Sequence, residues 1–236
     1  MKYWIVVPLV FLSMASFSQQ QSRRESFGEI SLAAGSYRGS ISLSYLNNWR
    51  LGEKRRFGVG IGLRATSFFG ANLNYITAPA RITSESTSPL IFFKESIAEN
   101  LDTLLIQSPQ VNFVNLMVNL EYRILPKLTV GFNIDAFGFS LGAKTRSNFM
   151  SNNHGKNVDA NPTPFNILLI SDNDRGSLNS ELYLKYFFSD KWSLKGGAQF
   201  LFTEYTTEVE VQEIPEKNDR FRNKALMLGI GIARKF

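Results

Sequence analysis

The segment that most constrains this chain is 224–236, because its residues alternate between two kinds of side chain. One set is bulky and mostly apolar, and it consists of Leu226, Leu228, Ile230, Ile232, Arg234 and Phe236. The intervening set is mostly small, and it consists of Ala225, Met227, Gly229, Gly231, Ala233 and Lys235. A repeat of two residues predicts a β-strand with one apolar face and one face of small side chains.

Seven further segments alternate in the same way, so the sequence predicts an all-β chain of eight strands. These segments span residues 27–35, 40–46, 57–69, 111–124, 128–141, 178–188 and 192–205. The segment 128–141 reverses its phase at Phe137 and Phe139. That reversal predicts a β-bulge or, if the strand crosses a bilayer, the point where it leaves the bilayer.

Residues 1–18 have the features of a cleaved Sec signal peptide. Lys2 supplies an early positive charge, residues 5–17 form a short apolar run, and Ser16 and Ser18 suit the two positions that a signal peptidase reads. The remaining residues 19–236 are expected to form one β domain. The chain has no Cys, which excludes disulfides and thiolate metal sites. No run reaches the roughly 18 apolar residues that a membrane-spanning helix needs.

Alternation alone does not separate a membrane barrel from a soluble, lipocalin-like one. Three further features favour the membrane. After the first hairpin, short connections (48–56, 125–127, 189–191) alternate with long ones (71–110, 144–176, 206–222). The apolar faces lack charge along their middles, where Lys or Arg costs about 2–4 kcal/mol. Aromatic residues gather at the short-turn ends, namely Tyr45, Trp49, Phe57, Tyr122, Tyr186, Trp192 and Phe236.

This pattern, together with the terminal Phe236, resembles the small OmpA-type outer-membrane β-barrel proteins of bacteria. The resemblance implies a transmembrane, antiparallel, up-and-down β-barrel in the outer membrane, with the short turns in the periplasm and the long loops outside. It also implies that the barrel assembly machinery reads Ile230, Ile232 and Phe236 in the last strand. Arg234 departs from the family pattern, which usually has an apolar or aromatic residue there. The expected partners are outer-membrane lipid and that machinery, and a monomer is expected.

The faces opposite the apolar ones carry charges of both signs, which are expected to face the barrel interior. These residues are Glu29, Arg64, Glu121, Arg123, Asp135, Glu181, Lys185 and Lys195. An eight-stranded barrel has an interior just wide enough for side chains, so ion pairs are expected to plug it. The alternative is a narrow channel for small molecules, which the inward glycines at 58, 60, 62, 229 and 231 keep open.

An enzyme is the second alternative, because lipid A acyltransferases and deacylases use this scaffold. Both need a His near the outer rim, and His154 is the single His of the chain. A base also needs a nucleophile within reach and an orienting carboxylate. Ser151 and Asp159 are near in sequence, but nothing fixes them, so His154 is interpreted as a loop residue. The sequence therefore predicts a protein without catalytic residues.

Two other motifs are interpreted conservatively. The segment 172–176, Asp-Asn-Asp-Arg-Gly, lacks the Glu and the further oxygen ligand of a calcium loop and is expected to be a turn. A basic turn that contains Arg50, Lys54, Arg55 and Arg56 is expected to be solvated. The net charge of +6 is spread along the chain and no nucleic-acid motif accompanies it. No metal, cofactor or nucleic acid is predicted.

The long loops contain apolar runs, which are unfavourable in water. Residues 89–93 and 101–106 are expected to pair as a hairpin that extends the barrel above the membrane; if they cross the bilayer instead, the barrel has ten strands. The expected role of the protein is structural or surface interaction, carried by these external loops.

Overall fold

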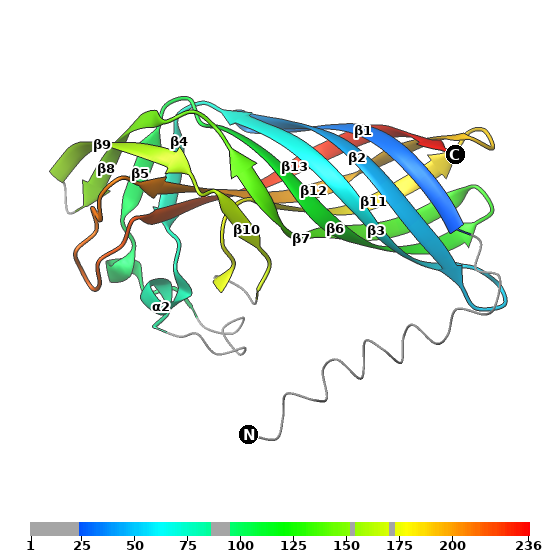
Figure 1. The fold of residues 1–236 in the computed structure, drawn as a ribbon, viewed down its shortest axis with the longest axis horizontal. Helices are drawn as coiled ribbons and strands as arrows, with labels where there is room; N and C mark the ends of the chain where they lie inside the picture. Colours follow the sequence, from blue (N-terminus) through cyan, green and yellow to red (C-terminus); the bar gives the residue numbers. More distant parts are fainter. Residues whose placement is uncertain (1–23, 86–94, 152–153, 170–172) are drawn as a thin grey trace, which may run out of the picture.

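In a computed structural model the described residues of the chain form one antiparallel sheet of thirteen strands (Figure 1). The structure describes residues 24–85, 95–151, 154–169 and 173–236. The predicted signal peptide lies outside these residues. The prediction of an all-β chain is confirmed, but the predicted number of eight strands is too low because the long connections form strands as well. Within the described residues, the sheet is accompanied by two short helices, α2 (Ala80–Thr83) and η2 (Ala98–Asn100).

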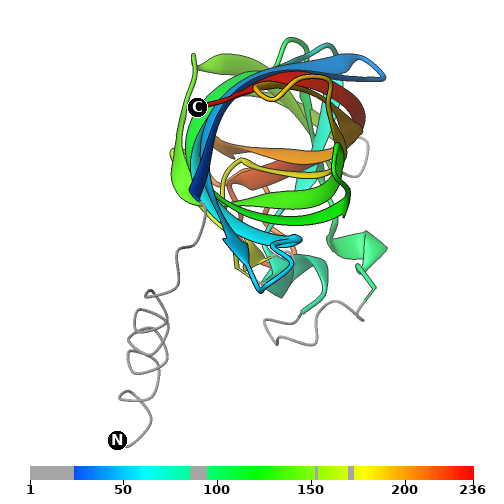
Figure 2. The same cartoon turned by 90° about the vertical axis from the view of Figure 1, so that its right-hand side faces the viewer.

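Eight of the strands pair in a closed antiparallel ring, in which the last strand pairs with the first (Figure 2). In ring order they are β1 (Arg24–Gly35), β2 (Arg38–Leu51), β3 (Phe57–Gly70), β6 (Gln110–Leu125), β7 (Leu128–Leu141), β11 (Leu178–Phe187), β12 (Trp192–Thr207) and β13 (Arg220–Lys235). Each corresponds to one of the eight predicted segments. The seam between β1 and β13 places Ile30 opposite Ile232 and Leu32 opposite Ile230.

Two details of the ring follow from the sequence pattern. The register between β6 and β7 shifts between Leu116 and Met117, where Met117 pairs with Asp135 and Leu116 with Phe137. This is the irregularity that the phase reversal in 128–141 predicts. By contrast, β2 continues to Leu51, although a polar turn was predicted from residue 48. The strand is longer because Arg50 turns inward and is buried.

The other five strands extend the sheet beyond the ring, at the end opposite the chain's C-terminus (Figure 1). They are β4 (Leu73–Thr77), β5 (Thr103–Ile106), β8 (Thr145–Ser151), β9 (His154–Pro162) and β10 (Phe165–Ile167). Four of them close a second, smaller ring with the ends of two long strands, in the order β12–β9–β8–β5–β4–β13. We call β4, β5, β8 and β9, with the adjoining ends of β12 and β13, the outer extension.

The outer extension corrects the expectation of a hairpin between 89–93 and 101–106. The β5 residues Thr103–Ile106 pair with β4 along one edge and with β8 along the other, so neither edge is available to another strand. Residues 89–93 lie outside the described residues. β5 belongs to the smaller ring and not to the eight-membered ring. The alternative in which residues 101–106 add a strand to the eight predicted ones is therefore wrong.

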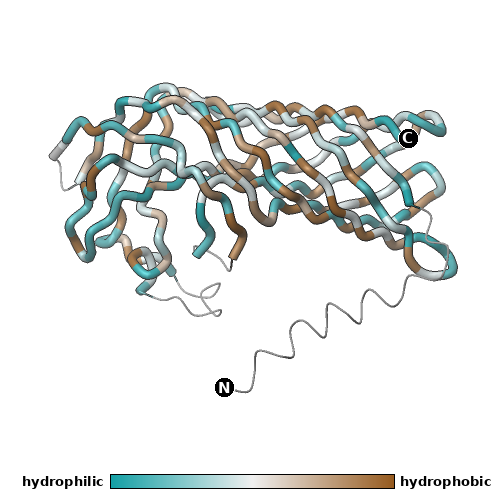
Figure 3. Tube along the Cα trace, viewed as in Figure 1, coloured by the Kyte–Doolittle hydropathy of each residue, from teal (hydrophilic) through white to brown (hydrophobic). Residues whose placement is uncertain are grey.

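Side-chain polarity changes along the length of the molecule (Figure 3). Hydrophobic residues recur along the ring strands, whereas the short turns at one end and the loops at the other are largely hydrophilic. No helix in the described ranges has the length and apolar character of a membrane span.

Candidate functional site

The interior of the eight-membered ring is the most distinctive site of the molecule. Because side chains alternate across a strand, the polar set of each ring strand points inward while its apolar set points out. Arg64 and Lys185 are among the largest fully buried side chains, each with an exposed fraction of 1%. Buried charges are stable only when they are paired and hydrogen-bonded, so the partners of these residues define the site.

A central cluster surrounds Arg64 on β3. Its guanidinium lies 2.5 Å from an Asp135 carboxylate oxygen and 3.2 Å from Glu181. It also donates hydrogen bonds to the Asn133 side chain at 2.8 Å and to the Asn179 carbonyl at 2.7 Å. Five N–H donors in a planar fork suit several acceptors at once, which is why Arg and not Lys fits this position.

Lys195 joins the same cluster from β12. Its ammonium pairs with Glu29 and lies 2.7 Å from Glu181, so Glu181 is shared between Lys195 and Arg64. The central cluster therefore links β1, β3, β7, β11 and β12 across the interior.

A second cluster lies nearer the short turns and is organised by two carboxylates. Glu121 pairs with Lys185 at 2.6 Å and with Arg50 at 2.7 Å. Glu25 pairs with Arg50 at 2.7 Å and with Lys235 at 2.7 Å, and Arg123 approaches it at 3.4 Å. Because Arg50 bridges both carboxylates and is 3% exposed, the expectation of a solvated Arg50 is wrong. Lys54, Arg55 and Arg56 remain in or beside the turn as expected.

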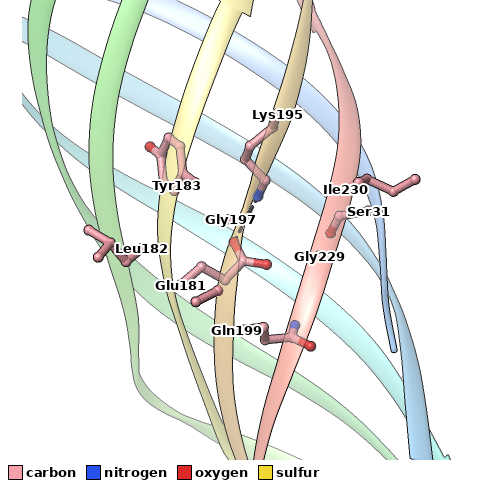
Figure 4. Close-up of a pocket in the computed structure, with 10 residues that line it drawn as sticks. Ser31, Glu181, Leu182, Tyr183, Lys195, Gly197, Gln199, Gly229 and Ile230 are labelled. Atoms are coloured by element: carbon pink, nitrogen blue, oxygen red, sulfur yellow. Dashed lines mark hydrogen bonds and ion pairs between the residues drawn. The ribbon is translucent and has the colours of Figure 1, made fainter. Parts of the chain in front are cut away.

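Tyr183 lies between the two clusters and contacts members of both, and Figure 4 shows it near Glu181 and Lys195 of the central cluster. Its hydroxyl oxygen lies 2.7 Å from Asn119 Oδ1 and 3.0 Å from Glu121 Oε1. Lys195 lies over its ring at 5.0 Å from the centroid. The cavity lined by Tyr183, Glu181 and Lys195 measures only ≈ 10 Å³, about the space of one water molecule.

The inward glycines make room for these side chains. A Cβ on Gly131 would collide with the Tyr183 ring, and one on Gly60 would collide with the Asn48 side-chain oxygen. Gly60 on β3 and Gly131 on β7 therefore leave space that neighbouring polar side chains occupy.

All eight residues predicted to face the interior take part in the two clusters. Glu25 and Arg50 were not predicted to face inward, and Tyr183 and Lys235, which the alternation places on the inner face, were not predicted to join the polar network. Glu25 precedes the predicted start of its strand, and Arg50 was assigned to a turn. Continuing the two-residue period outward from Glu29 and from Ser44 would have placed both of them on the inner face.

The interior becomes apolar where the ring meets the outer extension. On β6 the buried Phe113 is followed by the buried Asn115, and on β12 the buried Leu201 follows the buried Gln199. A single cluster of buried apolar residues continues from there through the smaller ring. It includes Phe68, Leu73, Tyr75, Leu104, Ile106, Val111, Phe113, Phe149, Leu201, Tyr205 and Phe221.

At the same level the outward face changes from apolar to charged side chains. On β13 the outward residues pass from Leu228 and Leu226, exposed by 79% and 72%, to Lys224 and then Arg222. On β12 the outward Glu204 is buried and lies 2.8 Å from both Arg220 and Arg222. Burial alone raises the pKa of Glu204, but the two guanidinium groups outweigh it, and its pKa is below the ordinary value.

At the short-turn end, aromatic residues lie on the outward face. Tyr45, Phe57, Tyr122, Tyr186, Trp192 and Phe236 are all exposed there. Phe57 and Tyr122 pair directly across β3 and β6. The residues of the predicted assembly signal, Ile230, Ile232 and Phe236, are also exposed on this outward face. Arg234 lies over the rings of Trp192 and Phe236, at 5.7 and 5.5 Å from their centroids.

The remaining candidates are placed as follows. His154 begins β9 and pairs across the hairpin with Ser151. Asp159 is five residues further along the same strand, faces Arg146 in the register, and lies 3.2 Å from Lys144. Asp174 accepts a hydrogen bond from the Leu169 N–H at 2.5 Å. Within the described residues no group of three or more His, Cys, Asp or Glu could hold a metal ion.

No family model matches the chain, and no curated protein matches it. Among solved structures it is similar to Neisserial surface protein A (NspA), with 8% identity, a TM-score of 0.36, and coverage of 90% of this chain and 96% of that one. It is similar to Ail, the attachment invasion locus protein of Yersinia pestis, with 10% identity, a TM-score of 0.36, and coverage of 92% and 100%.

A third similar structure is the Ralstonia pickettii toluene transporter TbuX, with 9% identity, a TM-score of 0.27, and coverage of 92% of this chain and 90% of that one. At these identities and TM-scores, none of the three likenesses supports a statement about what this chain does.

Proposed function

We propose that the protein is an integral outer-membrane β-barrel whose eight-membered ring spans the bilayer, with its lumen closed by ion pairs. Its role is structural or surface interaction, carried by the outer extension. The observation that carries this proposal is the inversion of polarity at one level of the molecule. Along the ring the interior is charged and the outside is apolar, whereas in the outer extension the interior is apolar.

The height of the apolar belt supports a membrane span. On the outward face of β13 the belt is bracketed by Lys224 and Arg234, ten positions apart in the sequence. At about 3.3 Å per residue this is about 33 Å along the strand. With a tilt of about 40° it projects to about 25 Å, the height of the apolar band in outer-membrane barrels.

The orientation follows from the two ends of the ring. Short turns and exposed aromatics such as Trp192 and Tyr122 occupy the end that carries residue 236, which is typical of the periplasmic side. The outer extension then projects from the cell. Its buried apolar core gives the external part a defined shape, which suits a surface that contacts a partner.

A closed lumen is favoured over the channel alternative because the charged groups neutralise each other across the interior. Arg64, Lys195 and their carboxylates span the ring, and the cavity beside Tyr183 holds about one water molecule. Ions would have to displace these pairs in order to pass.

A non-enzymatic role is proposed because Asp159, the carboxylate considered as an orienting group for His154, is engaged elsewhere. Asp159 lies 3.2 Å from the Lys144 ammonium. A base of the serine-hydrolase kind needs the carboxylate within hydrogen-bond reach.

Planar-bilayer recording tests the closed lumen. Folded protein, verified by its faster migration on an unheated gel, is expected to insert and to show no unitary current steps at neutral pH. Reproducible steps of one size would support the channel alternative instead.

Mass spectrometry of lipid A tests the non-enzymatic role. Cells with and without the protein are expected to contain the same lipid A species. A gain or loss of an acyl chain that disappears in His154→Ala would overturn this part of the proposal.

A further inference from the structure

Arg234 is placed differently from the other strand cations near the short turns. Its neighbour Lys235 points inward and pairs with Glu25 at 2.7 Å. Arg234 points outward, is exposed, and lies against the rings of Trp192 and Phe236. Within the described part of the chain its only recorded partners are these two rings, and no carboxylate lies within ion-pair distance of it.

The aromatic neighbours fix the guanidinium at one height of the outward face. The Phe236 ring itself rests over Gly28 of β1, where a Cβ would lie 3.2 Å from it. Trp192 is the first residue of β12 and pairs with Arg234 across the β12–β13 ladder. Arg234 is thus held at the seam where the first and last strands meet, and its N–H groups remain available on the side away from the rings.

A second cation lies beside this site. Lys191 is exposed and immediately precedes Trp192, and its carbonyl accepts a hydrogen bond from the Lys235 N–H at 2.7 Å. This bond holds the turn against the end of β13. Asp190 is the nearest acidic residue in sequence and, in the described residues, forms no ion pair.

The surrounding end of the ring is strongly basic. Exposed or half-buried cations there are Arg24, Lys54, Arg55, Arg56, Arg123, Lys127, Lys191, Arg234 and Lys235. The exposed acidic residues at the same end are Glu53 and Asp190. An anion near Arg234 would therefore experience a favourable field as well as the local contacts.

Immediately beyond the two cations the outward face is apolar. Leu194 and Ile232 pair across β12 and β13 and are exposed by 56% and 43%. A ligand that has an anionic group at the level of Arg234 and hydrocarbon at the level of Ile232 matches this surface. That combination is the chemistry of a phospholipid.

We propose that Arg234, supported by Trp192 and Phe236 and assisted by Lys191, binds the phosphate of an anionic phospholipid in the periplasmic leaflet. The inference rests on the proposed membrane span and orientation. A guanidinium presents two parallel N–H groups to two phosphate oxygens, and its stacking on aromatic rings leaves that edge free. Arg at this position, where the resembled family usually has an apolar or aromatic residue, is then explained by the ligand.

The test measures lipid selectivity in mixed vesicles. Protein is refolded into phosphatidylcholine vesicles, and the relative association of spin-labelled phosphatidylglycerol and spin-labelled phosphatidylcholine is measured by electron paramagnetic resonance. Wild type is expected to prefer phosphatidylglycerol, and Arg234→Gln is expected to lower the preference about fivefold, which corresponds to about 1 kcal/mol for one interfacial cation. Arg234→Lys keeps the charge without the planar stacking and is expected to lie between the two.

Lys127→Gln is the matched control, because it removes the same charge from an exposed turn residue at the same end. It is expected to keep most of the preference. Equal losses in Lys127→Gln and Arg234→Gln would show that only the diffuse basic field acts, and would overturn the site. Inorganic phosphate is also added to wild type as a competitor. If it abolishes the preference for phosphatidylglycerol, the site binds phosphate without selecting a lipid, which also contradicts the proposal.

The result is separable from the proposed function. Each variant is first checked for insertion and for the faster migration of folded protein on an unheated gel. Wild-type protein that inserts normally without any preference for phosphatidylglycerol would refute the lipid site and leave the membrane span intact. Failure of the wild type to insert would refute the membrane span itself.

Discussion

The ring and the outer extension are built from the same two-residue alternation, yet their interiors are opposite. On β6 the inward residues Phe113 and Asn115 are adjacent on one face and both are buried. Phe113 belongs to the apolar cluster of the outer extension. Asn115 donates a hydrogen bond to Asp135 at 2.8 Å in the charged interior of the ring.

The difference teaches that the surroundings of a sheet decide which face is apolar. A strand in water hides its apolar face inside, and a strand in lipid presents that face outward and keeps its polar groups together. In this chain one continuous strand, β13, shows both patterns, with the apolar Leu226 exposed outside in one region and the apolar Phe221 buried inside in the other. We therefore expect the two regions to respond differently to substitution.

The largest effect is expected for Asp135→Ala in the ring. It leaves Arg64 buried with Glu181 as its remaining carboxylate partner, and breaking a buried ion pair costs about 3–5 kcal/mol. Urea-induced unfolding in vesicles, followed by the change in gel migration, measures the loss. A change below about 1 kcal/mol would mean that the interior is hydrated well enough to compensate the charge.

A substitution in the apolar interior is expected to act locally. Phe113→Ala removes a buried ring and is expected to cost about 3 kcal/mol, confined to the outer extension. Amide hydrogen exchange of β4, β5 and β8 should accelerate while the ring strands stay protected. Val114→Ala, on the outward face of the same strand, is the control and should leave exchange unchanged; equal acceleration throughout the ring would refute two separable interiors.

Acid is expected to weaken the outer extension through Glu204. Its folded-state pKa lies below the ordinary value of 4.5, so its ion pairs stabilise the fold above that pH and the stabilisation is lost as the pH falls below it. Hydrogen bonds to charged groups contribute about 1.5–3 kcal/mol. Protease resistance of the extension should therefore decline below this pH in wild type, and Glu204→Gln should be less resistant at neutral pH and show a weaker pH dependence.

The smallest effect on stability is expected for removal of the exposed Lys144 side chain. Its ammonium lies near Asp159 and Glu208 at the surface of the extension, where solvent screens the attraction. Lys144→Ala should leave the unfolding midpoint unchanged within error in a denaturant titration. A clear destabilisation would mean that surface pairs, and not the apolar cluster, hold the extension together.

The ring was predictable because each of its strands is long and strictly alternating, and because the apolar set is uninterrupted. All eight ring strands and the irregularity within 128–141 were predicted from that pattern. The charged residues of the interior were predicted as well, except for Glu25 and Arg50. These two lie beyond the predicted ends of their strands, which are longer in the structure.

The outer extension was not predictable in the same way. Its own strands, such as Leu73–Thr77 and Thr103–Ile106, are only four to nine residues long, too short for alternation to be distinguished from chance. Their partners are also distant in sequence, as when β5 pairs with β8. Apolar runs in the long connections indicated that something must be buried there, but the pairing depends on tertiary structure.

The most direct test of the inverted interiors uses the absence of Cys in the chain, which allows one spin label at a chosen position. Leu228→Cys and Arg220→Cys label the outward face of β13 in the ring and in the outer extension, in protein refolded into vesicles. The label at 228 should be relaxed by oxygen and protected from a water-soluble nickel complex, and the label at 220 should show the reverse. Strong relaxation of the label at 228 by the nickel complex would contradict the membrane-spanning ring.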